Sequence, residues 1–174
     1  MLIDTSNLNI NKTYQCNEIG TSEIAQILQA LEHKKYPEFN KSELASHSFA
    51  LYYKNGSWMV WENHLKWKGV REYSLEEYEN DNKNASEKRI EVNQYDFDLD
   101  SFEYLKNNNP GYSVLDLAKI ASKRIIGIRL PNTPGMVCSE SIAHCGFKIC
   151  NSLKIKADYI TPADWQYYFF LKIR

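Results

Sequence analysis

The sequence predicts a single α+β domain in which an antiparallel sheet packs against helices. Segments with helical periodicity and segments with strand-like alternation are mixed without a regular βαβ order, which disfavours a doubly wound parallel sheet. Asn55-Gly56 stands between two strand-like runs, and this is the strongest short-range signal for an antiparallel hairpin. The length of 174 residues suits one hydrophobic core, so we expect one domain over residues 1–174.

The N-terminal part combines a polar segment with one helix. Residues 1–20 are polar and are expected to be irregular and peripheral, with Tyr14 pinned to the core. Thr21 can cap a helix that ends near His33, since Pro37 cannot continue it. This helix carries an apolar stripe that consists of Ile24, Ile27, Leu28 and Leu31.

The hairpin is expected to join strands at 48–53 and 58–61 through the turn 54–57. A loop of two or four residues makes Tyr53 oppose Trp58, whereas a three-residue loop would shift the register. Because side chains alternate along a strand, the first register places four side chains on one face. These side chains are His47, Phe49, Glu62 and His64.

The remaining elements are short and are read from caps, breakers and apolar spacing. In chain order we expect a helical turn at 73–78, an exposed polar loop at 80–87, a strand at 89–95, a helix at 101–106, a helix from Ser113 to Ile126, a helix from Cys138 to about Phe147, a short strand at 159–160, a capped helix start at 161–164 and a closing strand at 166–173.

The composition excludes several classes of function. The net charge is -1 and the basic residues are scattered, so no nucleic-acid partner is expected. No apolar run is long enough for a transmembrane segment, and the first residues lack the apolar core of a signal peptide. We therefore expect a cytoplasmic protein, with a phage-encoded or host-delivered origin left open. The four cysteines have irregular spacing and are expected to be free thiols.

Cys138 is the strongest candidate for a chemical role. It follows Pro134-Gly135 and opens a helical pattern, and at a helix start the free N–H groups and the dipole favour the thiolate. Upstream, His47 leads one strand of the hairpin and Glu62 stands on the other. In the expected register these two residues are diagonal neighbours about 7–8 Å apart. Glu62 can then reach the imidazole, fix its tautomer and stabilise its charge.

Each of these residues also has a structural interpretation. A cysteine in a helix is most often a small core hydrophobe, and a lone histidine is most often a surface or satisfied core residue. His64 shares the face of Glu62 and is the alternative partner. Glu62 itself needs a reason for its position, because it is flanked by the apolar run 58–61 and by Leu65.

No cofactor and no metal is expected. Cys138, His144, Cys145 and Cys150 are clustered, but their spacing matches no common zinc pattern and most of them would lie on one helix. The sequence has no glycine-rich phosphate loop, no Gly-x-Ser-x-Gly and no His-Glu-x-x-His.

The order of the motifs carries a resemblance to a known family. A His-led strand, a strand ending in Glu, a Gly-Val pair, a Val-Cys-Ser-Glu helix start and a later Tyr-Ile-Thr-Pro-Ala-Asp segment occur at 46–52, 60–63, 69–70, 137–140 and 159–164. In this order they resemble the circularly permuted papain-like hydrolases of the NlpC superfamily, and the YiiX-like group in particular. The resemblance covers about residues 40–165 apart from the polar loop.

The resemblance implies a role for each matching residue. Cys138 would be the nucleophile, His47 the general base and acid, and Glu62 the group that orients His47. The backbone N–H of Cys138 would be one donor of the oxyanion hole, and the second donor is unassigned. The chain departs from many relatives because the helix around 22–31 replaces a Gly-Asp strand before His47, which implies a remodelled substrate cleft.

The implied function is a cysteine hydrolase or acyltransferase that acts on an amide or ester bond through an acyl-enzyme. The substrate class stays open among small-molecule, peptide and lipid-type acyl compounds. One alternative is a non-catalytic binding or structural module on a papain-like scaffold, for example in a phage particle. Another is an unrelated α+β protein in which all three residues are structural. A Cys138 buried under side chains would favour the first alternative, and a long distance between the Cys138 sulfur and the His47 ring would favour the second. The sequence does not indicate an oligomeric state.

Overall fold

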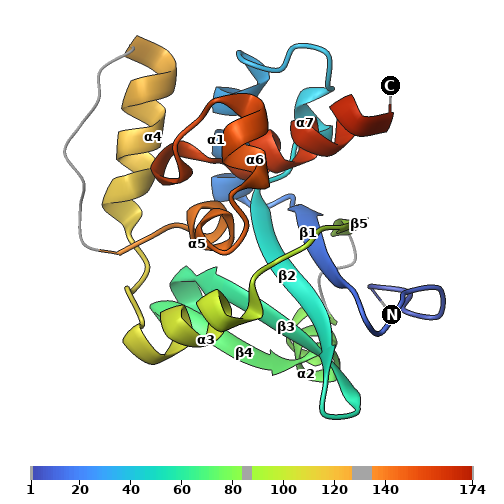
Figure 1. Cartoon of the computed structure of the whole chain (residues 1–174). Coiled ribbons are helices and arrows are strands. Elements are labelled where there is room, and N and C mark those ends of the chain that lie inside the picture. Colours follow the sequence, from blue (N-terminus) through green and yellow to red (C-terminus); the bar gives the residue numbers. More distant parts are fainter. Residues whose placement is uncertain (1, 84–87, 127–134, 174) are drawn as a thin grey trace.

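The computed structural model describes residues 2–83, 88–126 and 135–173 and has an α+β fold (Figure 1). Its sheet has five strands in the order β4-β3-β2-β1-β5, and every neighbouring pair is antiparallel. The strands are β1 (Thr13–Ile19), β2 (His47–Lys54), β3 (Ser57–His64), β4 (Gly69–Ser74) and β5 (Arg89–Gln94). The helices are α1 (Glu23–His33), α2 (Leu75–Asn82), α3 (Leu99–Asn108), α4 (Val114–Ile126), α5 (Cys138–His144), α6 (Lys148–Leu153) and α7 (Pro162–Ile173), with short 3-10 turns η1 (Lys41–Glu43), η2 (Leu65–Trp67) and η3 (Ala157–Tyr159).

The β2–β3 hairpin has the predicted register. Asn55 and Gly56 have φ angles of 52° and 84°, which is the pair of positive values that a tight two-residue hairpin turn requires. Tyr53 pairs with Trp58, as expected from a two- or four-residue loop. The turn chemistry therefore determines which side chains of the two strands share a face.

The two faces of the sheet carry separate parts of the core. On one face, Tyr52 and Trp61 pack with side chains from α3, α5, α6 and α7. On the other face, Phe49 and Val60 pack with α2 and the first residues of the chain. Figure 1 shows α5 against β2 and β3, with most of the other helices gathered above it. This division follows from the alternation of side chains along each strand.

The N-terminal segment is not peripheral as the sequence suggested. Strand β1 lies inside the sheet, between β2 and β5. Its polar residues are buried as well as its apolar ones, since Gln15 and Asn17 are both 0% exposed. The Gln15 amide donates to Asn17 Oδ1 over 2.7 Å, and the Ser48 hydroxyl donates to the same oxygen over 3.0 Å. A strand that buries paired polar groups has the composition of a loop, which explains the wrong prediction.

Helix α1 forms where it was predicted, but it is rotated. Its cap is Ser22, whose hydroxyl accepts from the helix, and not Thr21. Ile24 and Ile27 of the apolar stripe are 58% and 62% exposed. The buried face consists instead of Ala25, Gln29 and Glu32. The rotation arises because α1 packs against η1 and α4 and has no sheet face of its own to cover.

Three other predictions near the C-terminus need correction. The expected helix from Cys138 to about Phe147 forms as α5 but ends at His144, and α6 follows it from Lys148. The expected strands at 159–160 and 166–173 are the turn η3 and helix α7. In α7, the buried aromatic residues Trp165, Tyr168 and Phe169 recur at helical spacing, and that spacing prevails over the β propensity of aromatic side chains.

The polar loop expected at 80–87 is part helix, because α2 extends to Asn82. Residues 84–87 and the helix-breaking Pro134 lie outside the described residues.

Candidate active site

His47 and Glu62 form a close pair across the hairpin. His47 is the first residue of β2 and Glu62 lies near the end of β3. The His47 Nε2 and Glu62 Oε2 atoms are 2.6 Å apart. The side chains are 12% and 5% exposed. The structure therefore brings together the two residues that the register placed on one face.

Glu62 is ionised in spite of its burial. Burial alone would raise its pKa, but the hydrogen bond and the charge of His47 and the hydroxyl of Tyr73 lower the pKa to about 2. The Tyr73 O–H donates to Oε1, the oxygen that His47 does not use. Both carboxylate oxygens are thus engaged, which fixes the carboxylate plane against the imidazole.

Cys138 opens helix α5, as the sequence predicted. It follows the extended residue Val137 and is the first residue of the helix, so its N–H has no acceptor within the helix. The side chain of Glu140 accepts from the Val137 N–H over 3.3 Å. The residue is 4% exposed, yet its thiol does not belong to either core cluster.

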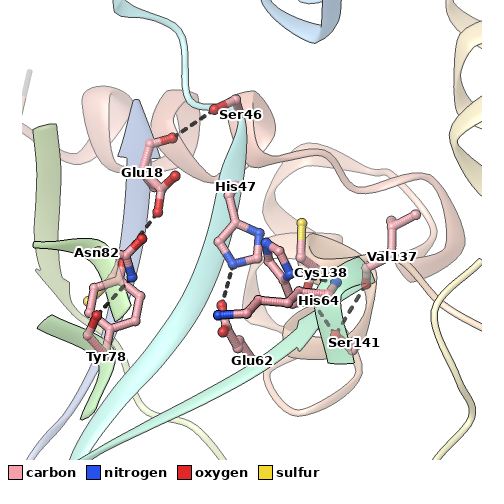
Figure 2. A network of polar contacts seen from close by, with 12 residues as sticks. Glu18, Ser46, His47, Glu62, His64, Tyr78, Asn82, Val137, Cys138 and Ser141 are labelled. Atoms are coloured by element: carbon pink, nitrogen blue, oxygen red, sulfur yellow. Dashed lines mark hydrogen bonds and ion pairs between the residues drawn. The ribbon is translucent and has the colours of Figure 1, made fainter. Parts of the chain in front are cut away.

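Cys138 lies close to the ring of His47 (Figure 2). Burial lowers the pKa of His47, but the nearby Cys138 and Glu62 raise that pKa well above the ordinary value. Figure 2 shows His47 between Glu62 and Cys138. Because Nε2 is bound to Glu62, Nδ1 is the ring nitrogen left for the thiol. The protonated ring is the state of His47 that this arrangement stabilises.

A largely apolar cavity lies beside the thiol. Its accessible volume is about 30 Å³, within a hollow of about 500 Å³ that includes open solvent, and Cys138 lines it. Glu32 contributes a carboxylate to its wall. The apolar lining comes mainly from α1, α4 and the segments next to α5 and α7: Leu28, Leu31, Tyr112, Ile120, Val137 and Pro162. The cavity can hold an apolar group next to the sulfur.

Tyr112 is a site residue that the sequence analysis missed. It lines the same cavity as Cys138, and burial and the nearby charge of Cys138 raise the pKa of its phenol. The phenol therefore stays protonated and is a hydrogen-bond donor. No local motif marks this tyrosine, because a long stretch of sequence separates it from Cys138.

Tyr112 lies on one of two neighbouring segments that run parallel and are held together. Tyr112 forms an isolated parallel bridge with Met136, two residues before Cys138. The buried amide of Asn63, on β3, donates to the carbonyls of Gly111 and Met136 over 3.3 and 3.0 Å. One side chain of the hairpin thus fixes both segments next to the nucleophile.

His64 lies near the pair but has a different environment. Its ring meets the His47 ring edge-on at 5.0 Å between centroids. Burial and then the charge of His47 lower the pKa of His64. Its Nδ1 accepts from the Lys66 N–H over 3.0 Å, so Nε2 carries the hydrogen of the neutral ring.

The cysteine-rich metal set considered from the sequence is not assembled. Cys145 belongs to the core beneath α5, with Cys150 packed against it. Within the described ranges, the group whose ligand atoms lie within 4.8 Å of one another is Glu140, His144 and Asp158. The ammonium of Lys119 already lies 4.0 Å from the Glu140 carboxylate, which supplies positive charge at that position.

The comparisons with known proteins leave the family open. No protein-family model matches the chain, and no curated protein matches it. None of the helices in the described part of the chain has both the length and the apolar character needed to cross a bilayer.

Proposed function

We propose that this protein is a cysteine hydrolase or acyltransferase with a circularly permuted papain-like fold. The observation that carries the proposal is the convergence of Cys138, His47 and Glu62 from α5, β2 and β3. A cysteine that only fills the core would not explain why a histidine next to it is hydrogen-bonded to a buried carboxylate. The order His, Glu, Cys along the chain agrees with a permuted connection of the same parts.

The proposed reaction uses two transfers of the acyl group. The thiolate of Cys138 attacks the carbonyl carbon, a carbon–sulfur bond forms and the carbonyl oxygen becomes an oxyanion. The oxyanion collapses, the bond to the leaving oxygen or nitrogen breaks, and the imidazolium of His47 gives its proton to that leaving atom. Water or an acceptor alcohol or amine then gives a proton to His47 and attacks the thioester. The product leaves and the thiolate returns. Glu62 keeps Nδ1 of His47 aimed at the sulfur throughout.

The apolar cavity supports a substrate with an apolar acyl part. The cavity lies next to the sulfur, where the acyl group of the thioester must be. Removing apolar surface from water contributes about 25 cal/mol per Å², so an aliphatic acyl chain gains binding energy there that an acetyl group lacks.

Tyr112 is proposed as the second oxyanion donor, next to the N–H of Cys138. Tyr112→Phe removes the hydroxyl and keeps the ring, so the fold should persist. Loss of one such donor typically slows acyl transfer by about 10²–10³-fold. The rate of acylation of Cys138 measures this effect, and Tyr53→Phe, on the hairpin, is the matched control. An unchanged rate in Tyr112→Phe would remove Tyr112 from the oxyanion hole.

The function is tested with p-nitrophenyl acetate, butyrate and octanoate. We expect release of nitrophenol, a mass increase on Cys138 equal to the acyl group, and faster acylation by octanoate than by acetate. Cys138→Ala should abolish the adduct and His47→Ala should slow it strongly. Acylation that spreads over several cysteines, or that persists in Cys138→Ala, would contradict the proposed site.

A binding module remains the second candidate because Cys138 is only 4% exposed. This function would leave the cavity able to hold an apolar ligand without chemistry. A thermal shift with octanoate and no adduct on Cys138 from any of the esters would favour it over the enzyme.

A further inference from the structure

Glu18 is a second carboxylate beside the candidate catalytic histidine. It lies on β1, directly opposite His47 on β2, so the two side chains share one face of the sheet. The Glu18 residue is 8% exposed. Its Oε2 accepts from the Tyr78 hydroxyl over 2.9 Å, and its Oε1 lies 2.8 Å from the ammonium of Lys88. Figure 2 shows Glu18 on the strand next to His47.

The charge of Glu18 acts on His47. Burial raises the pKa of Glu18, but the charges of His47 and Lys88 and the Tyr78 hydrogen bond lower it overall. Glu18 is therefore ionised at neutral pH. A Coulomb interaction is mutual, so the carboxylate that His47 stabilises must also stabilise the imidazolium.

Glu18 and His47 both line a second, polar cavity, whose lining does not include Cys138. Its accessible volume is about 50 Å³, within a hollow of about 330 Å³ that includes open solvent. The titratable and charged groups that face His47 from the surrounding elements are Glu18 on β1, Glu62 and His64 on β3, Lys66 on η2, Tyr73 on β4, Tyr78 and Asp81 on α2, Lys88 before β5 and Cys138 on α5. Within this group, Lys88 is the cation paired with Glu18, whereas Lys66 is paired with Asp81.

We propose that Glu18 is a second positioning carboxylate for His47, and that Lys88 limits how strongly Glu18 stabilises the protonated ring. This inference rests on the proposed function. Glu62 holds one ring nitrogen through a hydrogen bond, whereas Glu18 acts through its charge alone. Two carboxylates hold the proton on a buried imidazole more firmly than one, which keeps Cys138 as thiolate. Lys88 partly neutralises Glu18 and so limits this effect.

A structural role for Glu18 predicts something different. If Glu18 served only to bind Tyr78 and tie α2 to β1, its loss would lower the thermal stability and leave the His47 titration unchanged. A lowered His47 pKa in Glu18→Gln, against an unchanged one, therefore separates the two roles.

The experiment is an NMR titration of the histidine rings in a Cys138→Ala background, where no thiolate contributes. Glu18→Gln should lower the pKa of His47 by roughly one pH unit. Lys88→Met should raise it, because the charge of Glu18 is then less neutralised. Lys66→Met is the matched control, since Lys66 lines the same cavity but pairs with Asp81, and it should change the pKa of His47 least.

His64 gives a second readout in the same spectra. Glu18 raises the pKa of His64 and Lys88 lowers it, so the two variants should shift His64 in the same directions as His47. Unchanged pKa values of His47 in both variants, or shifts in one common direction, would overturn the proposal. If Glu18→Gln does not fold, Glu18→Met takes its place, since it removes the same charge; an unchanged pKa of His47 would then overturn the proposal, because Lys88→Met raises that pKa through the loss of its own charge as well.

The design keeps this proposal separate from the proposed function. The function fails if wild-type Cys138 forms no acyl adduct with the nitrophenyl esters. The proposed role of Glu18 is wrong if Cys138 is acylated but the pKa of His47 is the same in Glu18→Gln and Lys88→Met as in the parent protein.

Discussion

At Glu62, burial and charge act in opposite directions, and the lowered pKa shows that charge prevails. At His47, burial lowers the pKa, but the adjacent Cys138 and Glu62 raise it by more and so favour the protonated ring. At the other cysteines burial prevails. Burial raises the pKa of the Cys16, Cys145 and Cys150 thiols. Cys138 thus differs from the other three through its neighbours and not through its exposure.

Selective reactivity of Cys138 is the first prediction. Iodoacetamide should alkylate Cys138 at pH values well below about 8.5, the ordinary thiol pKa, while the other three thiols lag. Peptide mass spectrometry after timed labelling measures each site. His47→Ala is the control and should return the labelling of Cys138 to the profile of an ordinary thiol. Equal labelling of all four cysteines in the folded wild type would contradict the site.

Glu62→Gln is the second prediction. The amide oxygen can still accept from the His47 ring, so the fold should persist, but the charge that stabilises the imidazolium is lost. Cys138 alkylation near neutral pH should fall about tenfold if the His47 pKa drops by one unit. Glu62→Leu should reduce it further, because nothing then holds the tautomer. Wild-type labelling rates in both variants would exclude Glu62 as the orienting group, and His64 would be tested next.

At the scale of elements, α1 shows that the more apolar stripe of a helix need not be its buried face. Ile27 is 62% exposed, whereas Gln29 is 3% exposed. The Gln29 amide donates to the carbonyls of Gly20 and Leu44, over 3.1 and 2.9 Å. These two bonds tie the helix to the segments on either side of it, and one of those segments leads into His47.

The third prediction follows from this rotation. Gln29→Leu should lower the free energy of unfolding by about 1–3 kcal/mol, because it leaves two buried carbonyls without a donor. Ile27→Gln should change it by no more than about 0.5 kcal/mol. Urea unfolding of both variants measures the difference. If Ile27→Gln proved the more damaging of the two, α1 would have the orientation that its apolar stripe suggested.

At the scale of the whole molecule, the candidate site lies where the sheet meets the helices above it. The hairpin supplies His47 and Glu62, and the first residue of α5 brings Cys138 to them (Figure 2). The stability of the fold therefore depends in part on the charged groups that also carry the proposed chemistry.

The fourth prediction concerns acid. The pKa of Glu62 is about 2 in the folded chain against an ordinary value of 4.5, so the folded state binds fewer protons than the unfolded one between these values. The stabilisation from Glu62 is fully present above about pH 4.5 and is lost as the pH falls toward 2. The difference in unfolding free energy between wild type and Glu62→Gln should shrink over that range. Glu76→Gln, at an exposed position of α2, is the control and should show no such narrowing. A difference that stays constant with pH would contradict the assignment.

The sequence by itself determined the features that depend on neighbouring residues. Asn55-Gly56 specified a turn, the turn specified the register, and the register placed His47 and Glu62 on one face. The spacing after Pro134-Gly135 placed Cys138 at the start of a helix. Each of these depends on backbone conformation or on alternation over a few residues, which local sequence encodes.

Only the tertiary structure determined which residues that are far apart in the sequence lie next to each other. It placed β1 inside the sheet, where the Gln15 amide and the Ser48 hydroxyl both donate to Asn17 Oδ1. It brought Glu18 beside His47 through that strand, and Tyr112 beside Cys138 through the Asn63 amide. The physical reason is the same in each case. A polar side chain can be buried only where distant segments supply its partners, and no local pattern records those partners.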